Sequence, residues 1–101
     1  MAMELRLLGG VRLRRAVLGI LLAAHSPLTI TEVITELNAA GYTTWSLGPR
    51  PPQQVIANLL AYQVRVGKVR RTARATYAPR RDAIPSTTQW RCRHWRDVPG
   101  N

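Results

Sequence analysis

A run of basic side chains between residues 65 and 81 carries the clearest chemistry in this sequence. Seven of these seventeen residues are Arg or Lys, and none is acidic. Guanidinium groups form paired hydrogen bonds with phosphate oxygens and with guanine, so such a run suits a polyanion such as nucleic acid. Val69 and Tyr77 give apolar anchors to two short strand-like stretches that flank a turn at 73–75. The pattern therefore predicts a folded hairpin that displays arginine, because a disordered basic tail would not need these anchors.

A second set of candidate contacts precedes the hairpin, within residues 52–66. At 100° per residue, Ile56, Leu60 and Val64 fall on one side of a helix. The opposite side is a narrow stripe formed by Gln54, Asn58, Ala61 and Arg65. Gln and Asn pair through two hydrogen bonds with adenine, and Arg pairs with guanine or phosphate. Every surface helix has a polar face, so the stripe favours base contact mainly because the basic hairpin follows it directly.

The remaining reactive side chains form no catalytic or metal-binding set. Cys92 is the only cysteine, and His25 and His94 stand far apart. The acidic residues, none of which forms a pair expected to share a pocket, are Glu4, Glu32, Glu36, Asp82 and Asp97. A glycine-rich phosphate loop and a nucleophile with its general base are also missing. We therefore expect no enzyme, cofactor, metal or small-molecule substrate, and we interpret Cys92 as a bystander.

Composition and charge agree with a small folded domain that binds a polyanion. The chain has 101 residues, 46% of them hydrophobic, and a formal net charge of +10. Arginines at 12–15 precede the apolar stretch 16–24, which is also the pattern of a signal peptide. Glu4 in the would-be basic region and the helix pattern that follows residue 24 favour a buried first helix instead. We expect a cytoplasmic protein located at the nucleoid, with no membrane partner.

The helices and strands that position the candidate contacts can be predicted from the periodicity of apolar residues and from capping and helix-breaking residues. Residues 1–11 show no period and are interpreted as a leader, and 12–24 are predicted to be a helix. A short extended run is expected at 28–30. The next helix starts after Thr31 as N-cap, or after Thr29 in a capping box with Glu32.

The second half of the chain is divided in the same way. Gly41 is predicted to end the second helix, and Gly67 the helix at 52–66. The proline-rich stretch 42–52 is predicted to be a loop. The hairpin strands are expected at 68–72 and 76–78, where Pro79 stops the second strand. Residues 81–101 are interpreted as a basic tail in which Ser86 and Gln89 would cap a short helix reaching Trp95.

The order helix, short strand, helix, loop, helix, hairpin over residues 12–80 resembles the winged helix-turn-helix family of DNA-binding proteins. Gly67-Lys68-Val69-Arg70-Arg71 and Thr76-Tyr77-Ala78-Pro79 are similar to the wing of small bacterial members. The resemblance implies a mainly α fold with a small β-hairpin (α+β), in which three helices precede a basic C-terminal wing and a short tail. The link from Gly41 to Pro52 is longer than the tight turn of the motif, which leaves the register of the third helix open.

In that family the third helix enters the major groove, and the wing contacts the DNA backbone or the minor groove. Here this implies base contacts from the stripe on 52–66, and a minor-groove contact from Arg74. Arg50 and the start of the same helix would bind a phosphate. The residues predicted to contact double-stranded DNA are Arg50, Gln53, Gln54, Asn58, Arg65, Lys68, Arg70, Arg71, Arg74, Arg80 and Arg81. Such a protein would be a transcriptional regulator or a nucleoid-associated binder.

Two other classes of function stay open. The chain would be a protein-docking module if its tryptophans formed a partner surface, and a homodimer would then use the Trp90/Trp95 tail or the first helix. RNA binding would also explain the charge. We expect Trp90 and Trp95 to dock on the domain or a second subunit rather than to stack on bases. Trp45 is expected to fold back on the core.

Overall fold

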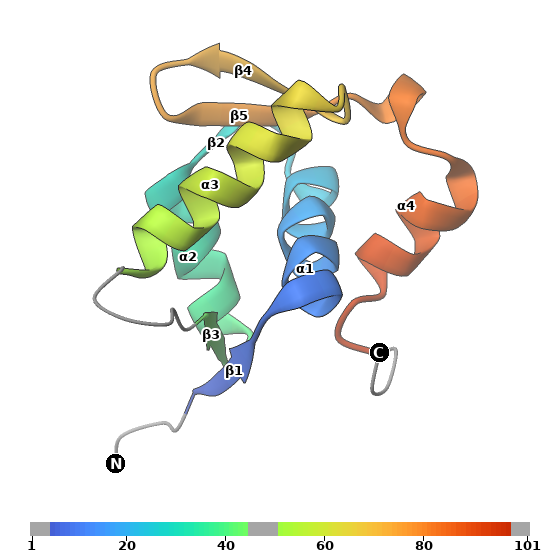
Figure 1. The fold of residues 1–101 in the computed structure, drawn as a ribbon. Coiled ribbons are helices and arrows are strands. Elements are labelled where there is room, and N and C mark those ends of the chain that lie inside the picture. The colour runs from blue at the N-terminus through green and yellow to red at the C-terminus, as the bar shows by residue number, and fades with distance from the viewer. Residues whose placement is uncertain (1–4, 45–50, 98–101) are drawn as a thin grey trace.

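The core is arranged around a central helix, α1. The computed structural model describes residues 5–44 and 51–97 and gives them an α+β fold. Its α-helices in this part of the chain are α1 (Gly10–Ala23), α2 (Ile30–Ala39), α3 (Pro52–Arg65) and α4 (Ser86–Arg93). Helix α1 lies between α2 and α4, and α3 packs on α2 (Figure 1). The residues from Ala16 to Leu22 are all buried, because α1 is covered on more than one side.

Two small sheets lie at opposite ends of this helical core (Figure 1). The strands of the described residues are β1 (Arg6–Leu8), β2 (Leu28–Thr29), β3 (Tyr42–Thr44), β4 (Val69–Ala73) and β5 (Thr76–Pro79). One sheet is antiparallel in the order β2-β5-β4, and the other pairs β1 with β3. The antiparallel sheet joins the basic hairpin to the beginning of α2, because β2 ends where α2 starts.

Helix α2 begins at the capping box that was one of two alternatives. The Oγ1 atom of Thr29 accepts a hydrogen bond from the Glu32 backbone N–H at 3.1 Å. The Glu32 carboxylate accepts one from the Thr29 backbone N–H at 2.9 Å. Thr29 is therefore the N-cap, and Thr31 lies inside the helix. Gly41 follows the end of α2 with φ of +90°, a conformation that glycine adopts without a steric penalty.

The hairpin is held to the core by the two predicted anchors. Val69 on β4 is 1% exposed and Tyr77 on β5 is 8% exposed. Tyr77 pairs with Leu28 of β2 on one side and with Arg71 of β4 on the other. The turn is also attached to α2, since the Ile30 N–H donates to the Ala75 carbonyl at 3.2 Å. The predicted hairpin and its apolar anchors are confirmed, but the expected end of the second strand is wrong, because Pro79 is the last residue of β5 and pairs with Val69.

Two segments predicted to lack regular structure contain strands. The leader prediction for residues 1–11 is wrong at Arg6–Leu8, which forms β1, and α1 already begins at Gly10. The loop prediction for 42–52 is wrong at Tyr42–Thr44, which forms β3. The two strands pair in parallel, with Leu8 opposite Thr44, and both of these residues are buried. Each strand is three residues long, so neither shows a period that the sequence alone would reveal.

The segment after the hairpin folds onto the core. A 3-10 turn, η1 (Arg81–Ala83), leads into α4, which packs along α1. The predicted short helix is confirmed, but it ends at Arg93 instead of reaching Trp95, and its capping box is wrong. Pro85 occupies the N-cap, and the Gln89 amide donates to the carbonyls of Arg81 and Ile84, both at 2.9 Å.

The two tryptophans beyond the hairpin have different environments. Trp95 packs against the core and makes an edge contact with Tyr42, with ring centroids 5.2 Å apart, as expected for docking. Trp90 is 57% exposed and stacks on the His94 ring, so it does not dock on the domain, and of the two expected alternatives docking on a second subunit stays a prediction. Trp45 lies outside the described residues.

Candidate nucleic-acid interface

The outer face of α3 carries the predicted polar stripe. Gln53, Gln54, Asn58 and Arg65 are all exposed, while Ile56 and Leu60 on the opposite face are completely buried. The Gln54 Nε2 atom donates to Asn58 Oδ1 at 3.0 Å, so these amides are held together one helical turn apart. Both amides retain further donors and acceptors for an external partner. Arg65 ends the stripe in the last turn of α3, where a cation interacts favourably with the helix dipole.

Sequence reasoning missed three residues of α3 and its end. Tyr62 is 53% exposed and Val66 is 45% exposed, so the outer surface is less polar than the stripe suggested. Gln63 is 2% exposed and lies on the buried side. The helical period could have predicted both positions. Tyr62 is four residues from the exposed Asn58, and Gln63 is three residues from the buried Leu60.

The β4–β5 hairpin displays three of the predicted arginines. Arg70, Arg71 and Arg74 are all exposed. The strand register shifts between Arg71 and Ala73, which marks a bulge just before the turn. The turn itself is fixed by two hydrogen bonds: Thr76 Oγ1 donates to the Arg74 carbonyl at 2.9 Å, and Arg71 Nε donates to the Ala73 carbonyl at 3.3 Å. The backbone that carries these cations is therefore ordered.

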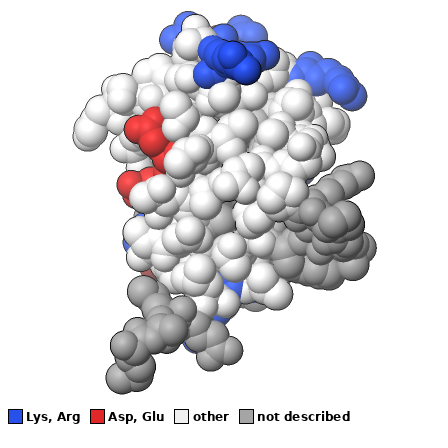
Figure 2. Space-filling view, turned by 90° about the vertical axis from the view of Figure 1, so that its left-hand side faces the viewer, with Lys and Arg blue, Asp and Glu red and all other residues white. Residues whose placement is uncertain are grey.

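On the face shown in Figure 2, positive charge is concentrated at the hairpin end. Figure 2 shows Lys and Arg side chains gathered there, above a wide uncharged surface, with Asp and Glu side chains on one flank. A localised group of cations produces a stronger local potential than the same charges spread over the surface. Glu32 and Glu36 on α2 are the acidic residues of the helices that pack beside this surface.

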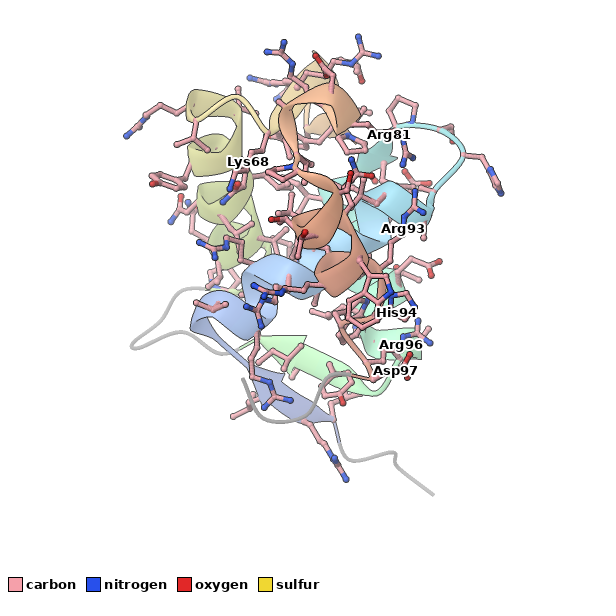
Figure 3. All side chains as sticks on the ribbon, turned by 90° about the vertical axis from the view of Figure 1, so that its right-hand side faces the viewer. Lys68, Arg81, Arg93, His94, Arg96 and Asp97 are labelled. Carbon is pink, nitrogen blue, oxygen red and sulfur yellow. The ribbon has the colours of Figure 1, made fainter. Side chains whose placement is uncertain are left out.

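The other predicted contacts, at the base of the hairpin, do not all face the same way. Arg80 is exposed, and its backbone N–H donates to the Lys68 carbonyl at 2.8 Å. Arg81 reaches the opposite way: its Nη2 atom donates to the Leu22 carbonyl near the end of α1, at 2.8 Å (Figure 3). Lys68 is half-buried and lines a small cavity with residues of α1 and α4. Arg50 lies outside the described residues.

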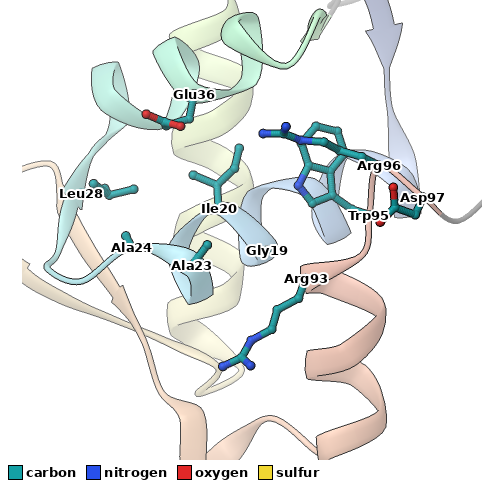
Figure 4. Close-up of a pocket in the computed structure, with 10 residues that line it drawn as sticks. All are labelled: Gly19, Ile20, Ala23, Ala24, Leu28, Glu36, Arg93, Trp95, Arg96 and Asp97. Carbon is teal, nitrogen blue, oxygen red and sulfur yellow. The ribbon is translucent and has the colours of Figure 1, made fainter.

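A larger cavity of about 440 Å³ lies on the other side of α1, between α2 and the segment after α4. Figure 4 shows Ile20 of α1 and Ala24, just after the end of α1, at this cavity, with Glu36 on one side and Arg93 on the other. The Arg96 guanidinium lies 5.3 Å from the centre of the Trp95 ring, which is within the range of a cation–π contact. The lining mixes apolar and oppositely charged groups, so it has no single chemical preference.

The only thiol is buried beneath the small cavity. Cys92 is 1% exposed, and burial raises the pKa of its thiol. Arg15, Arg14 and Lys68 act in the opposite sense, because their positive charges favour the thiolate. The raised pKa means that burial outweighs these charges, so the group is a neutral thiol near pH 7 rather than a nucleophile.

The described residues hold no candidate metal site and no membrane-spanning helix. Within 5–44 and 51–97, no three His, Cys, Asp or Glu side chains gather in a way that would hold a metal ion. No helix in these ranges combines the length and apolar character needed to cross a membrane. No protein-family model matches the chain, and no curated protein or solved structure is significantly similar to it.

Proposed function

We propose that this chain is a winged helix-turn-helix protein that binds double-stranded DNA. Helix α3 would enter the major groove, and the β4–β5 hairpin would act as the wing on the DNA backbone or in the minor groove. The protein would work in the cytoplasm at the nucleoid, as a transcriptional regulator or a nucleoid-associated binder, without catalysis. The observation that carries the proposal is the ordered hairpin with Arg70, Arg71 and Arg74 exposed, directly after the exposed face of α3.

The two parts of this surface would do different work. Arginines on the hairpin would neutralise phosphates, so affinity would be high at low salt and would fall steeply as salt rises. Gln54 and Asn58 would read base edges, since paired amides suit adenine. Arg65, between the two regions, and Arg80, at the base of the hairpin, would contact the backbone. Tyr62 would add an apolar contact beside Asn58.

The test is an electrophoretic shift with duplexes of random sequence at several salt concentrations. The triple variant R70A/R71A/R74A should bind every duplex more weakly and show a shallower salt slope, by about one phosphate contact for each arginine removed. The matched control is R6A/R12A/R93A, which removes the same charge from exposed positions outside the hairpin. Equal affinities of the hairpin variant and the control would refute the proposed role of the hairpin.

One observation favours protein docking as a second candidate. Trp90 is 57% exposed, whereas Trp95 is partly buried and the middle of α1 is buried within the chain, so of the elements expected to form a dimer Trp90 is the one that stays available for an apolar contact. Light scattering of wild type and W90A over a range of concentrations tests this, with self-association lost in the variant as the supporting result. RNA binding is separated from DNA binding by competition between duplex DNA and structured RNA at equal salt.

A further inference from the structure

A small cavity lies where α1, the start of the hairpin and α4 meet. Its volume is about 120 Å³, and four of its seven lining residues are cations. The lining residues are Arg14, Arg15, Leu18, Lys68, Thr88, Arg91 and Cys92. Figure 3, which views the molecule from the α4 side, shows Lys68 on this face. The fold thus brings together cations from three separate parts of the sequence.

All of the charged side chains that line the cavity are positive. None of its described lining residues is acidic, and the buried Cys92 holds its proton at neutral pH. Arg14 and Arg91 are exposed and Lys68 is half-buried, so water screens the repulsion between these positive charges without removing it. An anion in the cavity would replace this repulsion with attraction.

The backbone that supports the cavity is fixed by hydrogen bonds and packing. The Lys68 N–H donates to the Gln63 carbonyl at 3.0 Å, and the Lys68 carbonyl accepts from Arg80 at 2.8 Å. Arg14 and Arg91 lie on α1 and α4, the two helices that pack together in the core. The cations are therefore presented by rigid elements, which favours a defined binding geometry.

We propose that this cavity binds a phosphate group. Arginine offers paired donors to phosphate oxygens, lysine offers a compact charge, and the Thr88 hydroxyl offers a further hydrogen bond. The volume corresponds to about four water molecules at roughly 30 Å³ each, which leaves room for one tetrahedral oxyanion. The bound group is either a free small phosphate or one phosphate of a larger molecule that remains outside. The site does not depend on DNA binding by α3 and the hairpin.

The test is a titration of the isotopically labelled protein with inorganic phosphate, followed by NMR at constant ionic strength in chloride. Backbone amides around Arg14, Lys68 and Arg91 should shift and saturate with one phosphate bound. The R14A/R91A variant should bind about tenfold more weakly or worse, because it loses two charge-assisted contacts. The control R12A removes an exposed cation of α1 that does not line the cavity, and it should bind like wild type.

A second variant keeps the test decisive if R14A/R91A folds poorly. The charge reversal R91E should raise the unfolding temperature in phosphate-free buffer, because it relieves the repulsion. It should also abolish the rise in unfolding temperature that phosphate gives the wild type. Shifts that do not saturate, or equal phosphate affinity in wild type and R91E, would overturn the proposal.

Duplex DNA distinguishes the two sources of the phosphate. If a saturating duplex shifts the amides of the cavity and blocks inorganic phosphate, the group is a backbone phosphate. If phosphate still binds in the presence of the duplex, the ligand is a small phosphorylated molecule. The hairpin variant R70A/R71A/R74A should keep its phosphate affinity, so failure of DNA binding and failure of this site give different results.

Discussion

Gly19 of α1 and Cys92 of α4 lie where the backbones of the two helices touch. A Cβ atom on Gly19 would overlap the carbonyl oxygen of Cys92, and it would come within 2.8 Å of Cδ1 of Trp95. Glycine is therefore required at this position by the packing of α4, and its own backbone is ordinary helix. The contact joins the segment after the hairpin to the centre of the core.

The substitution G19A should destabilise the protein. Alanine in a helix interior is normally favoured over glycine by about 1 kcal/mol. Here the clash should outweigh that gain and give a net loss of about 1–3 kcal/mol or more, because backbone atoms cannot move aside as a flexible side chain can. Urea denaturation measures the change, with G9A at the exposed N-cap of α1 as the control. A stabilised G19A protein would show that α4 does not pack here.

The capping box of α2 gives a second prediction with an internal control. T29A removes the side-chain acceptor for the Glu32 N–H and should cost about 1 kcal/mol of unfolding free energy. T31A changes an exposed threonine inside the first turn and should have a much smaller effect. Chemical denaturation of the two variants compares them directly. Equal losses would place the helix start elsewhere.

Adjacent arginines at the base of the hairpin should have separable effects. R81A removes the hydrogen bond to the Leu22 carbonyl and should lower the free energy of unfolding by about 1 kcal/mol, a value reduced because the side chain is partly exposed. R80A should leave stability nearly unchanged and weaken binding to duplex DNA. Thermal unfolding and electrophoretic shift of both variants test the pair. Loss of stability in R80A with little change in R81A would contradict the hydrogen bond from Arg81 to the Leu22 carbonyl.

The buried thiol predicts a dependence of stability on pH. Burial raises the pKa of Cys92, so the folded protein keeps the proton at pH values where the unfolded thiol has lost it. The resulting stabilisation is complete below the unfolded value of about 8.5 and is lost as pH rises through the folded value. The stability difference between wild type and C92A should therefore shrink from pH 7 to pH 10 in urea denaturation. A constant difference would mean that the folded thiol titrates normally.

Local features of the sequence were predictable because their causes span only a few residues. The capping box joins Thr29 and Glu32, and the two faces of α3 follow the helical period. The hairpin follows from Val69 and Tyr77 on either side of a short turn, and Gly41 and Gly67 both adopt the left-handed conformation at helix ends. Each of these is an interaction within one element or between two elements joined by a turn.

The tertiary structure alone decided the features that join distant segments. The pairing of β1 with β3 brings Leu8 beside Thr44, and the packing of α4 brings Cys92 onto Gly19. The same packing gathers Arg14, Lys68 and Arg91 around one cavity, which no local pattern indicates. The sequence by itself determined the helices, the hairpin and which arginines the hairpin displays, but not the short strands β1 and β3. Which cations face one another depends on how those elements pack, because that is settled by contacts across the whole core.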